Sequence, residues 1–216
     1  MTKRLLSVSL VRHAVNVPTA PEALQRQTPA VERLTHAAAE AFAAKGFSAT
    51  TTRDIASGAG LSPAGVYVHF ASKEELLFEL SRSGHEAALA LVREAATGAT
   101  SPTEQLAAIM RRFSVWHVEQ FQMARVVYHE HSHLTAAHQA HVLGLRKEID
   151  RHVRSVLEAG IEAGEFRIDD VPDTALALLS IVIDVARWYS PTIKRTPTQI
   201  GETNAALGLR LVGAPR

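Results

Sequence analysis

Five histidines lie close together in the sequence, at positions 129, 131, 133, 138 and 141. On a helix, His129 and His133 would share a face, and so would His138 and His141. Imidazole nitrogens bind divalent ions, and Glu130 or His117 could complete such a site. The cluster is therefore compatible with a metal-responsive protein. Solvated or capping histidines, or histidines that bind another ligand, are the alternatives, and we expect no bound metal.

Catalysis is the second chemistry to weigh, because serine, histidine and aspartate all occur. The chain lacks the GxSxG pattern that places a nucleophilic serine on a sharp turn. The histidines of HEHSH, at residues 129–133, are two apart, which puts neighbours on different faces of a helix. We expect no enzyme and no cofactor, and a helical enzyme is kept only as an alternative.

A third pattern, TTTRDIASGAGLSPAGVYVHF at residues 50–70, indicates two short helices joined by a tight turn. Thr51 and Asp54 have the spacing of a capping box. Gly60 suits a left-handed turn, and Ser62 followed by Pro63 is a typical helix start. This order is typical of a helix-turn-helix, whereas a tight corner inside a helical bundle is the alternative.

Small residues at the start of the second helix suit a helix that enters the major groove by its N-terminal end. Pro63 and Ala64 can contact thymine methyl groups, and Gly65 lets the backbone approach closely. Arg53 is the strong base-reading side chain. The expected DNA contacts are Thr52, Arg53, Pro63, Ala64, Gly65, Tyr67, His69 and Lys73.

The longer stretch TTTRDIASGAGLSPAGVYVHFASKEELL resembles the DNA-binding signature of the TetR family of transcriptional regulators, over about residues 30–80. The resemblance implies a homodimer that binds a palindromic operator, usually as a repressor released by a small molecule. It places the family's DNA contacts on the eight residues just given. Pro63-Ala64-Gly65 departs from the pattern by offering few hydrogen bonds, so operator reading should lean on Arg53, methyl contacts and DNA shape.

The segment at residues 111–131 collects large aromatic and soft side chains, which small-ligand sites favour. Core packing is the alternative for each of them. The expected effector-binding residues are Phe113, Trp116, His117, Phe121, Met123, Tyr128, Arg187 and Trp188.

A softer resemblance concerns the effector itself. YHEHSHLTAAHQAH, RKEIDRHVRSVLEAGIEAGEFR and ARWYSP are similar to a branch of the family that responds to acyl-CoA thioesters and controls fatty-acid or sterol degradation. An acyl tail would suit an apolar bundle interior, and the CoA phosphates would need basic residues at its mouth. The available arginines are Arg111, Arg112, Arg125, Arg146 and Arg187.

The segment at residues 173–191 is apolar nearly all round, so it must be covered on more than one side. With residues 196–213 it predicts a helix pair that packs against a second subunit, and an internal core helix is the alternative. Asp184 within this segment needs a partner, which Arg187 or an arginine across the interface would supply. A contact of Asp184 with the ligand is the other interpretation.

The elements that must position these residues are helical throughout, because strand patterns are nearly absent. Helices are expected at residues 30–45, 52–58, 63–69, 73–96, 103–118, 121–133, 136–163, 173–189 and 197–212. The expected fold is all-α, with a flexible N-terminal arm at residues 1–28, a three-helix DNA-binding domain at 29–75, and a larger effector-binding and dimerisation domain at 76–216.

Composition limits the remaining choices. The 216 residues are 46% hydrophobic and 21% charged, which is an ordinary globular balance. A net charge of +1 means that any DNA contact must come from a local patch. The chain has no cysteine, and no apolar run approaches the roughly 18 residues that span a bilayer. The N-terminal apolar run is short and ends at Arg12, so we expect a cytoplasmic protein rather than a secreted one.

Overall fold

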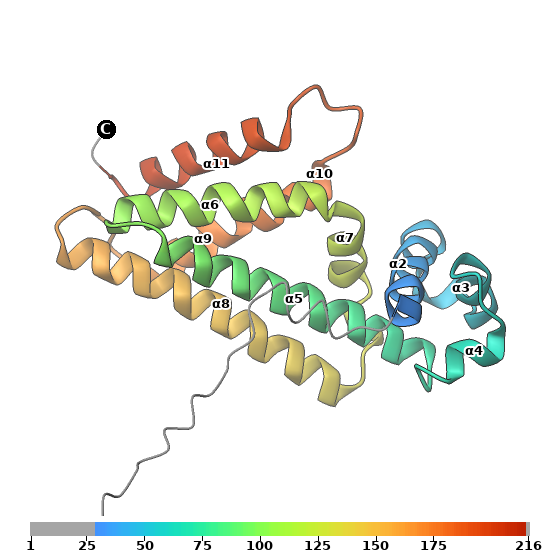
Figure 1. Ribbon diagram of the computed structural model, residues 1–216. Helices are drawn as coiled ribbons and strands as arrows, with labels where there is room; N and C mark the ends of the chain where they lie inside the picture. The colour runs from blue at the N-terminus through green and yellow to red at the C-terminus, as the bar shows by residue number, and fades with distance from the viewer. Residues whose placement is uncertain (1–28, 215–216) are drawn as a thin grey trace, which may run out of the picture.

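The computed structural model describes residues 29–214, and every regular element in that range is a helix (Figure 1). The all-α prediction is therefore confirmed for the described part of the chain. The arm expected at residues 1–28 lies outside the described residues. The elements are α2 (Pro29–Ala49), α3 (Thr52–Gly58), α4 (Pro63–Tyr67), α5 (Lys73–Thr97), α6 (Pro102–Glu119), α7 (Phe121–His129), the 3-10 turn η1 (His131–His133), α8 (Ala136–Glu162), α9 (Val171–Ile183), α10 (Val185–Trp188) and α11 (Pro197–Leu211).

Helices α2, α3 and α4 form a small unit at one end of the molecule (Figure 1). Its core contains Leu34 and Phe42 of α2, Ile55 of α3 and Val66 of α4, all of which are buried. Gly60, between α3 and α4, has a φ of 66°, a conformation that glycine adopts without steric cost. The expected glycine turn between the two short helices is confirmed.

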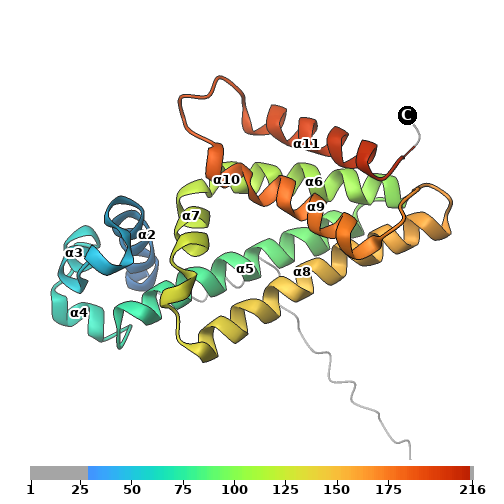
Figure 2. The ribbon, with the colours of Figure 1, turned by 180° about the vertical axis from the view of Figure 1, so that it is seen from behind.

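Helices α5, α6 and α8 run side by side through the larger part of the molecule, with α9 and α11 covering α6 (Figure 1 and Figure 2). Its core draws on Leu106 and Phe113 of α6, Leu157 of α8 and Leu178 of α9. Because α5 begins against the small unit and ends in this core, a single helix links the two parts. The division expected at residue 75 falls within that helix.

Two expected helices are interrupted in the structure, and the one expected at residues 63–69 ends at Tyr67. The helix expected at 121–133 ends at His129, and a separate 3-10 turn covers His131–His133 before Thr135 caps α8. The helix expected at 173–189 is divided at Asp184 into α9 and α10. None of the described helices is long and apolar enough to cross a membrane.

Candidate DNA-binding surface and effector-binding helices

Helix α3 begins with a complete capping box. The Thr51 hydroxyl accepts a hydrogen bond from the Asp54 backbone N–H at 3.1 Å, and Asp54 Oδ2 accepts one from the Thr51 N–H at 2.8 Å. Lys45 Nζ donates to the other carboxylate oxygen at 3.0 Å. The hydrogen bonds from Thr51, followed by that from Lys45, hold the pKa of Asp54 well below its usual range. The start of α3 therefore keeps a charged cap at neutral pH.

Helix α4 begins at Pro63, where the missing N–H leaves no unsatisfied donor. The Ser62 hydroxyl accepts from the Gly65 backbone N–H at 3.1 Å. Val66 is buried, so it holds the helix to the core while Pro63 and Ala64 remain exposed. The small residues at this end of α4 leave its first turn open to an approaching partner.

The expected DNA contacts on α3 and α4 come largely to the surface. Arg53, Tyr67 and His69 are exposed, and the hydroxyl oxygens of Thr52 and Tyr67 lie 3.3 Å apart. Sequence reasoning did not select Val68, although its apolar side chain is 77% exposed directly after α4. The signal that could have selected Val68 is its position in the sequence between Tyr67 and His69, two of the expected DNA contacts. Contact of any of these residues with DNA remains a prediction.

Lys73 occupies a different environment from the other expected contacts. Its ammonium donates to the backbone carbonyls of Phe47 at 2.5 Å and Thr50 at 2.7 Å, and lies 4.3 Å from the centroid of the Phe47 ring. These contacts join the first turn of α5 to the last turn of α2 and to the connection that follows it. The structure thus gives Lys73 a positioning role in the helix-turn-helix, and its expected phosphate contact is untested.

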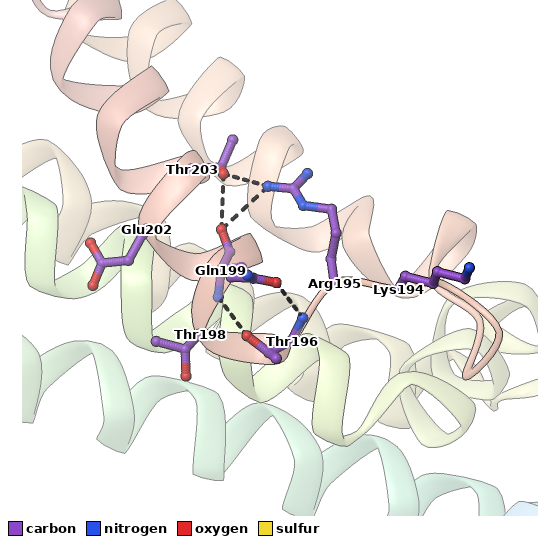
Figure 3. A pocket seen from close by; sticks show the side chains of 7 residues that line it. All are labelled: Lys194, Arg195, Thr196, Thr198, Gln199, Glu202 and Thr203. Carbon is purple, nitrogen blue, oxygen red and sulfur yellow. Dashed lines mark hydrogen bonds between the residues drawn. The ribbon is translucent and has the colours of Figure 1, made fainter.

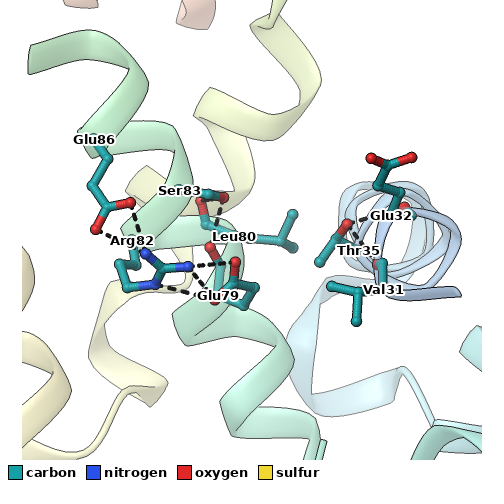
Figure 4. Close-up of polar contacts among 8 residues, drawn as sticks. All are labelled: Val31, Glu32, Thr35, Glu79, Leu80, Arg82, Ser83 and Glu86. Carbon is teal, nitrogen blue, oxygen red and sulfur yellow. Dashed lines mark hydrogen bonds and ion pairs between the residues drawn. The ribbon is translucent and has the colours of Figure 1, made fainter. Parts of the chain in front are cut away.

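A second contact between α2 and α5 lies further along α5 and nearer the start of α2 (Figure 4). Leu80 of α5 points toward Thr35 of α2, whose hydroxyl is turned back to donate to the carbonyls of Val31 and Glu32, at 3.0 Å each. On another side of α5, Arg82 forms ion pairs with both Glu79 and Glu86 at 2.7 Å. Leu80 thus presents an apolar group to α2, while Arg82 is paired with two glutamates of α5 itself.

The histidine cluster lies largely at the junction between the small unit and the larger body. His133 stacks on Phe47 with ring centroids 4.7 Å apart, and His138 stacks on Phe78 at 3.7 Å. His138 Nδ1 also lies 2.7 Å from Glu74 Oε1. These contacts join η1 to the last turn of α2, and the start of α8 to α5.

The same geometry bears on metal binding. HEHSH has the H-E-x-x-H spacing of zinc hydrolases, which the sequence reading overlooked, but α7 ends at His129 and η1 begins at His131. The two outer histidines therefore do not share one continuous helix, as that motif requires. Within residues 29–214, no group of three or more His, Cys, Asp or Glu side chains is placed to hold a metal ion.

The eight expected effector-binding residues do not gather around one cavity in the described structure. Phe113 and His117 are buried in the core, and Trp116 packs partly against it. Tyr128 is 65% exposed and Trp188 is 41% exposed. The remaining three, in other places, are Phe121 on α7 facing α2, Met123 against Gly84 of α5, and Arg187 on α10. In this structure they therefore occupy separate core and surface positions, and contact of any of them with an effector stays a prediction.

Asp184 and Arg187 form the expected ion pair, with the Arg187 Nε and the Asp184 Oδ1 atoms 2.5 Å apart. The hydrogen bond from Arg187 lowers the pKa of Asp184. Both side chains are exposed to solvent. The ion pair therefore joins the end of α9 to α10 at the surface rather than in the core.

Surface hollows are found elsewhere on the described molecule. One, of about 510 Å³, lies between α2 and α7 and includes Phe121 and Arg125. The Arg125 guanidinium donates to the carbonyls of Ala186 at 2.7 Å and Tyr189 at 2.6 Å, so it braces α7 against α10. Another, also about 510 Å³, surrounds the start of α11, where Arg195 donates to Thr203 (Figure 3). Both hollows are open to the surface.

Comparison with known proteins settles what kind of chain has this arrangement. Residues 34–80 match the family described as bacterial regulatory proteins, tetR family, and residues 99–212 match the tetracyclin repressor-like C-terminal domain. The chain belongs to the TetR family. It is thus a transcriptional regulator with an N-terminal helix-turn-helix, and the expectation that it is not an enzyme is confirmed.

Relatives of this TetR-family chain cover most of its length. The transcriptional repressor KstR2 of Mycobacterium tuberculosis is 33% identical over 176 residues, which is 80% of this chain and 87% of that protein. The structure of a tetR-family regulator from Rhodococcus RHA1 is 36% identical, with a TM-score of 0.82 over 88% of this chain and 100% of the other. AibR, solved with isovaleryl coenzyme A and operator DNA, shares the fold at 23% identity and a TM-score of 0.75, covering 82% of this chain and 97% of AibR.

Proposed function

We propose that this TetR-family regulator is a homodimeric repressor that binds a palindromic operator and is released by a small apolar effector such as an acyl-CoA. The observation that carries the proposal is the capped helix-turn-helix, with Arg53, Tyr67 and His69 exposed beside the small-residue start of α4. Because the proposed partner is operator DNA, we expect the protein in the cytoplasm.

Exposed apolar side chains on α9 and α11 support the dimer. Leu176 and Ile183 of α9 are 63% and 41% exposed, and Leu207 and Leu211 of α11 are 42% and 46% exposed. A soluble monomer rarely leaves so many large apolar groups uncovered on neighbouring helices. A second copy of the same face would bury them and would set two recognition helices at a fixed spacing, as a palindromic site requires.

An acyl-CoA effector is supported by chemistry and by the fold. The larger part of the molecule is an apolar helical bundle, which suits an acyl chain. AibR shows that the same fold accommodates both isovaleryl coenzyme A and operator DNA. Helix α5 reaches from the helix-turn-helix into the bundle core, so a ligand that favours one position of α5 would change operator affinity.

Operator binding and dimerisation are tested together by analytical ultracentrifugation of the purified protein with DNA from its own upstream region. The wild-type protein should sediment as a dimer and bind a specific fragment as a dimer. Leu176→Glu should sediment as a folded monomer and lose specific binding. A wild-type monomer, or equal binding to unrelated DNA, would contradict the proposal.

A further inference from the structure

The arginines expected at the mouth of an effector site differ sharply in their partners. Arg111 pairs with Glu202 at 2.6 Å, and Arg112 pairs with Glu94 at 3.1 Å. Arg187 pairs with Asp184, and Arg125 is bound by backbone carbonyls of α10 and the residue after it. Four of these five guanidinium groups are therefore already occupied by oxygen atoms of the protein.

Arg146 of α8 is the exception. Its Nε donates to His85 Nε2 of α5 at 3.0 Å, and within residues 29–214 no carboxylate pairs with it. The side chain is partly buried, and desolvation lowers the pKa of Arg146. A cation held away from water without an acidic partner is costly, because burial removes solvation that no counter-charge replaces.

His85 cannot act as that counter-charge. Its Nδ1 lies 2.6 Å from the carbonyl oxygen of Ser81, so this nitrogen donates and Nε2 is left to accept from Arg146. The imidazole is therefore neutral, and burial lowers the pKa of His85 to about 4. The positive charge stays on Arg146, and its two terminal nitrogens retain N–H groups that can bind an anion.

Two further polar side chains lie within electrostatic reach of the same guanidinium. Arg146 interacts electrostatically with the phenol of Tyr128 and the imidazole of His131. His131 Nδ1 is buried and has no hydrogen-bond partner in the described structure. Tyr128 is 65% exposed, so the cluster opens to the surface. Polar side chains of α7, η1 and α8 are thus within electrostatic reach of one another, and none of them is a carboxylic acid. His85 of α5 holds Arg146 in place as a hydrogen-bond acceptor.

Apolar core residues follow about one turn further along both helices. Leu89 is one turn beyond His85 on α5, and Ile149 is about one turn beyond Arg146 on α8. Both are buried members of the main core. If Arg146 binds the charged group of a ligand, the apolar tail of that ligand would therefore point toward apolar side chains.

We propose that Arg146, with His85, Tyr128 and His131 around it, binds the oxyanion of an effector that also carries an apolar tail. This inference rests on the proposed function, because it assigns the anionic end of the same effector. A carboxylate of a free fatty acid and a phosphate of an acyl-CoA share the required chemistry. Arginine binds either one through paired N–H groups.

The experiment measures binding of decanoyl-CoA, decanoate and decanol to the full-length protein by isothermal titration calorimetry. Arg146→Gln and Arg146→Lys are compared with Arg151→Gln, which changes an exposed arginine on the same helix. Wild type should bind at least one of the two anions and should bind decanol much more weakly. Arg146→Gln should raise the Kd for that anion about tenfold or more, and Arg146→Lys should raise it by less. Arg151→Gln should change the Kd by less than about twofold.

The three probes distinguish the sources of the anion. Dependence on Arg146 for decanoyl-CoA alone would assign a phosphate, whereas dependence for decanoate would assign a carboxylate. Equal affinity of wild type and Arg146→Gln for both anions, decanol binding as tight as that of the anions, or no binding of either anion would overturn the assignment. Wild-type operator binding, measured in parallel, shows separately whether the proposed function fails. A circular-dichroism melt of each variant shows whether it is folded.

Discussion

The hydroxyl of Thr52 on α3 lies 3.3 Å from the hydroxyl of Tyr67 on α4, so the two helices of the DNA-binding unit are joined at their exposed side. Both residues were expected to reach DNA. Tyr67→Phe removes this hydrogen bond while keeping the ring. We expect Tyr67→Phe to bind operator several-fold more weakly with a nearly unchanged melting temperature, because an exposed hydrogen bond contributes only about 1 kcal/mol. Equal operator affinity would show that the contact has no role in binding.

Arg53 should carry much of the base reading, because its side chain is exposed and the start of α4 offers few hydrogen-bonding groups. Loss of an arginine contact to a base costs about 1–3 kcal/mol, so Arg53→Ala should weaken operator binding roughly ten- to hundredfold. Anisotropy titrations on operator and on unrelated DNA would measure this. Arg151→Ala removes an equal charge from α8 and should leave both affinities nearly unchanged. If the two variants behaved alike, Arg53 would act only through net charge.

Lys73 offers a test between a phosphate contact and a positioning role. Lys73→Met removes the bonds to the carbonyls of Phe47 and Thr50, so it should lower the free energy of unfolding by about 1–3 kcal/mol. It should also weaken operator binding. The slope of log affinity against log salt concentration should stay the same if Lys73 only positions the helices. A slope reduced by about one would instead identify a phosphate contact.

Gly160 and Gly144 lie on the same helix, α8, in opposite surroundings. A Cβ on Gly160 would lie 2.0 Å from the Phe166 ring, whereas a Cβ on Gly144 would meet nothing within 4 Å. Gly160→Ala should therefore destabilise the protein by about 1–3 kcal/mol through overpacking. Gly144→Ala should stabilise it by up to about 1 kcal/mol through helix propensity. Urea unfolding measures both, and a stable Gly160→Ala variant would contradict this packing.

Burial of His117 predicts a pH dependence. Its desolvation lowers the pKa to about 4 from an ordinary value of 6.5, so the unfolded chain binds more protons between these values. Stability is therefore complete above pH 6.5 and falls as the pH drops toward 4. Between pH 6.5 and 4.5, His117→Leu should lose about 1–2 kcal/mol less stability than wild type. His36→Gln, at an exposed position, should keep the wild-type pH dependence.

The helix-turn-helix could be predicted because its signals are local. The Thr51–Asp54 cap, Gly60 and the Ser62-Pro63 start each act within a few residues of chain, so the sequence alone places them. The role of Lys73 could not be predicted in the same way. Its carbonyl partners lie more than twenty residues earlier, and only the packing of α5 against α2 brings them together.

An effector site is harder to predict from the sequence for a related reason. The many aromatic residues at 111–131 are as typical of core packing as of a ligand site, and Phe113 indeed lies in the core. The cluster around Arg146 draws its members from four elements, so no sequence spacing reveals it. The histidines likewise gave no sign that His133 and His138 would stack on Phe47 and Phe78 across the junction.

The central claim is that an acyl-chain ligand controls operator binding by this protein. Its most direct test is a fluorescence-anisotropy titration on DNA from the protein's own upstream region, with and without decanoyl-CoA. We expect tight, sequence-specific binding that saturating decanoyl-CoA weakens at least tenfold, while coenzyme A alone has little effect. Specific binding that is unchanged by decanoyl-CoA would contradict the claim.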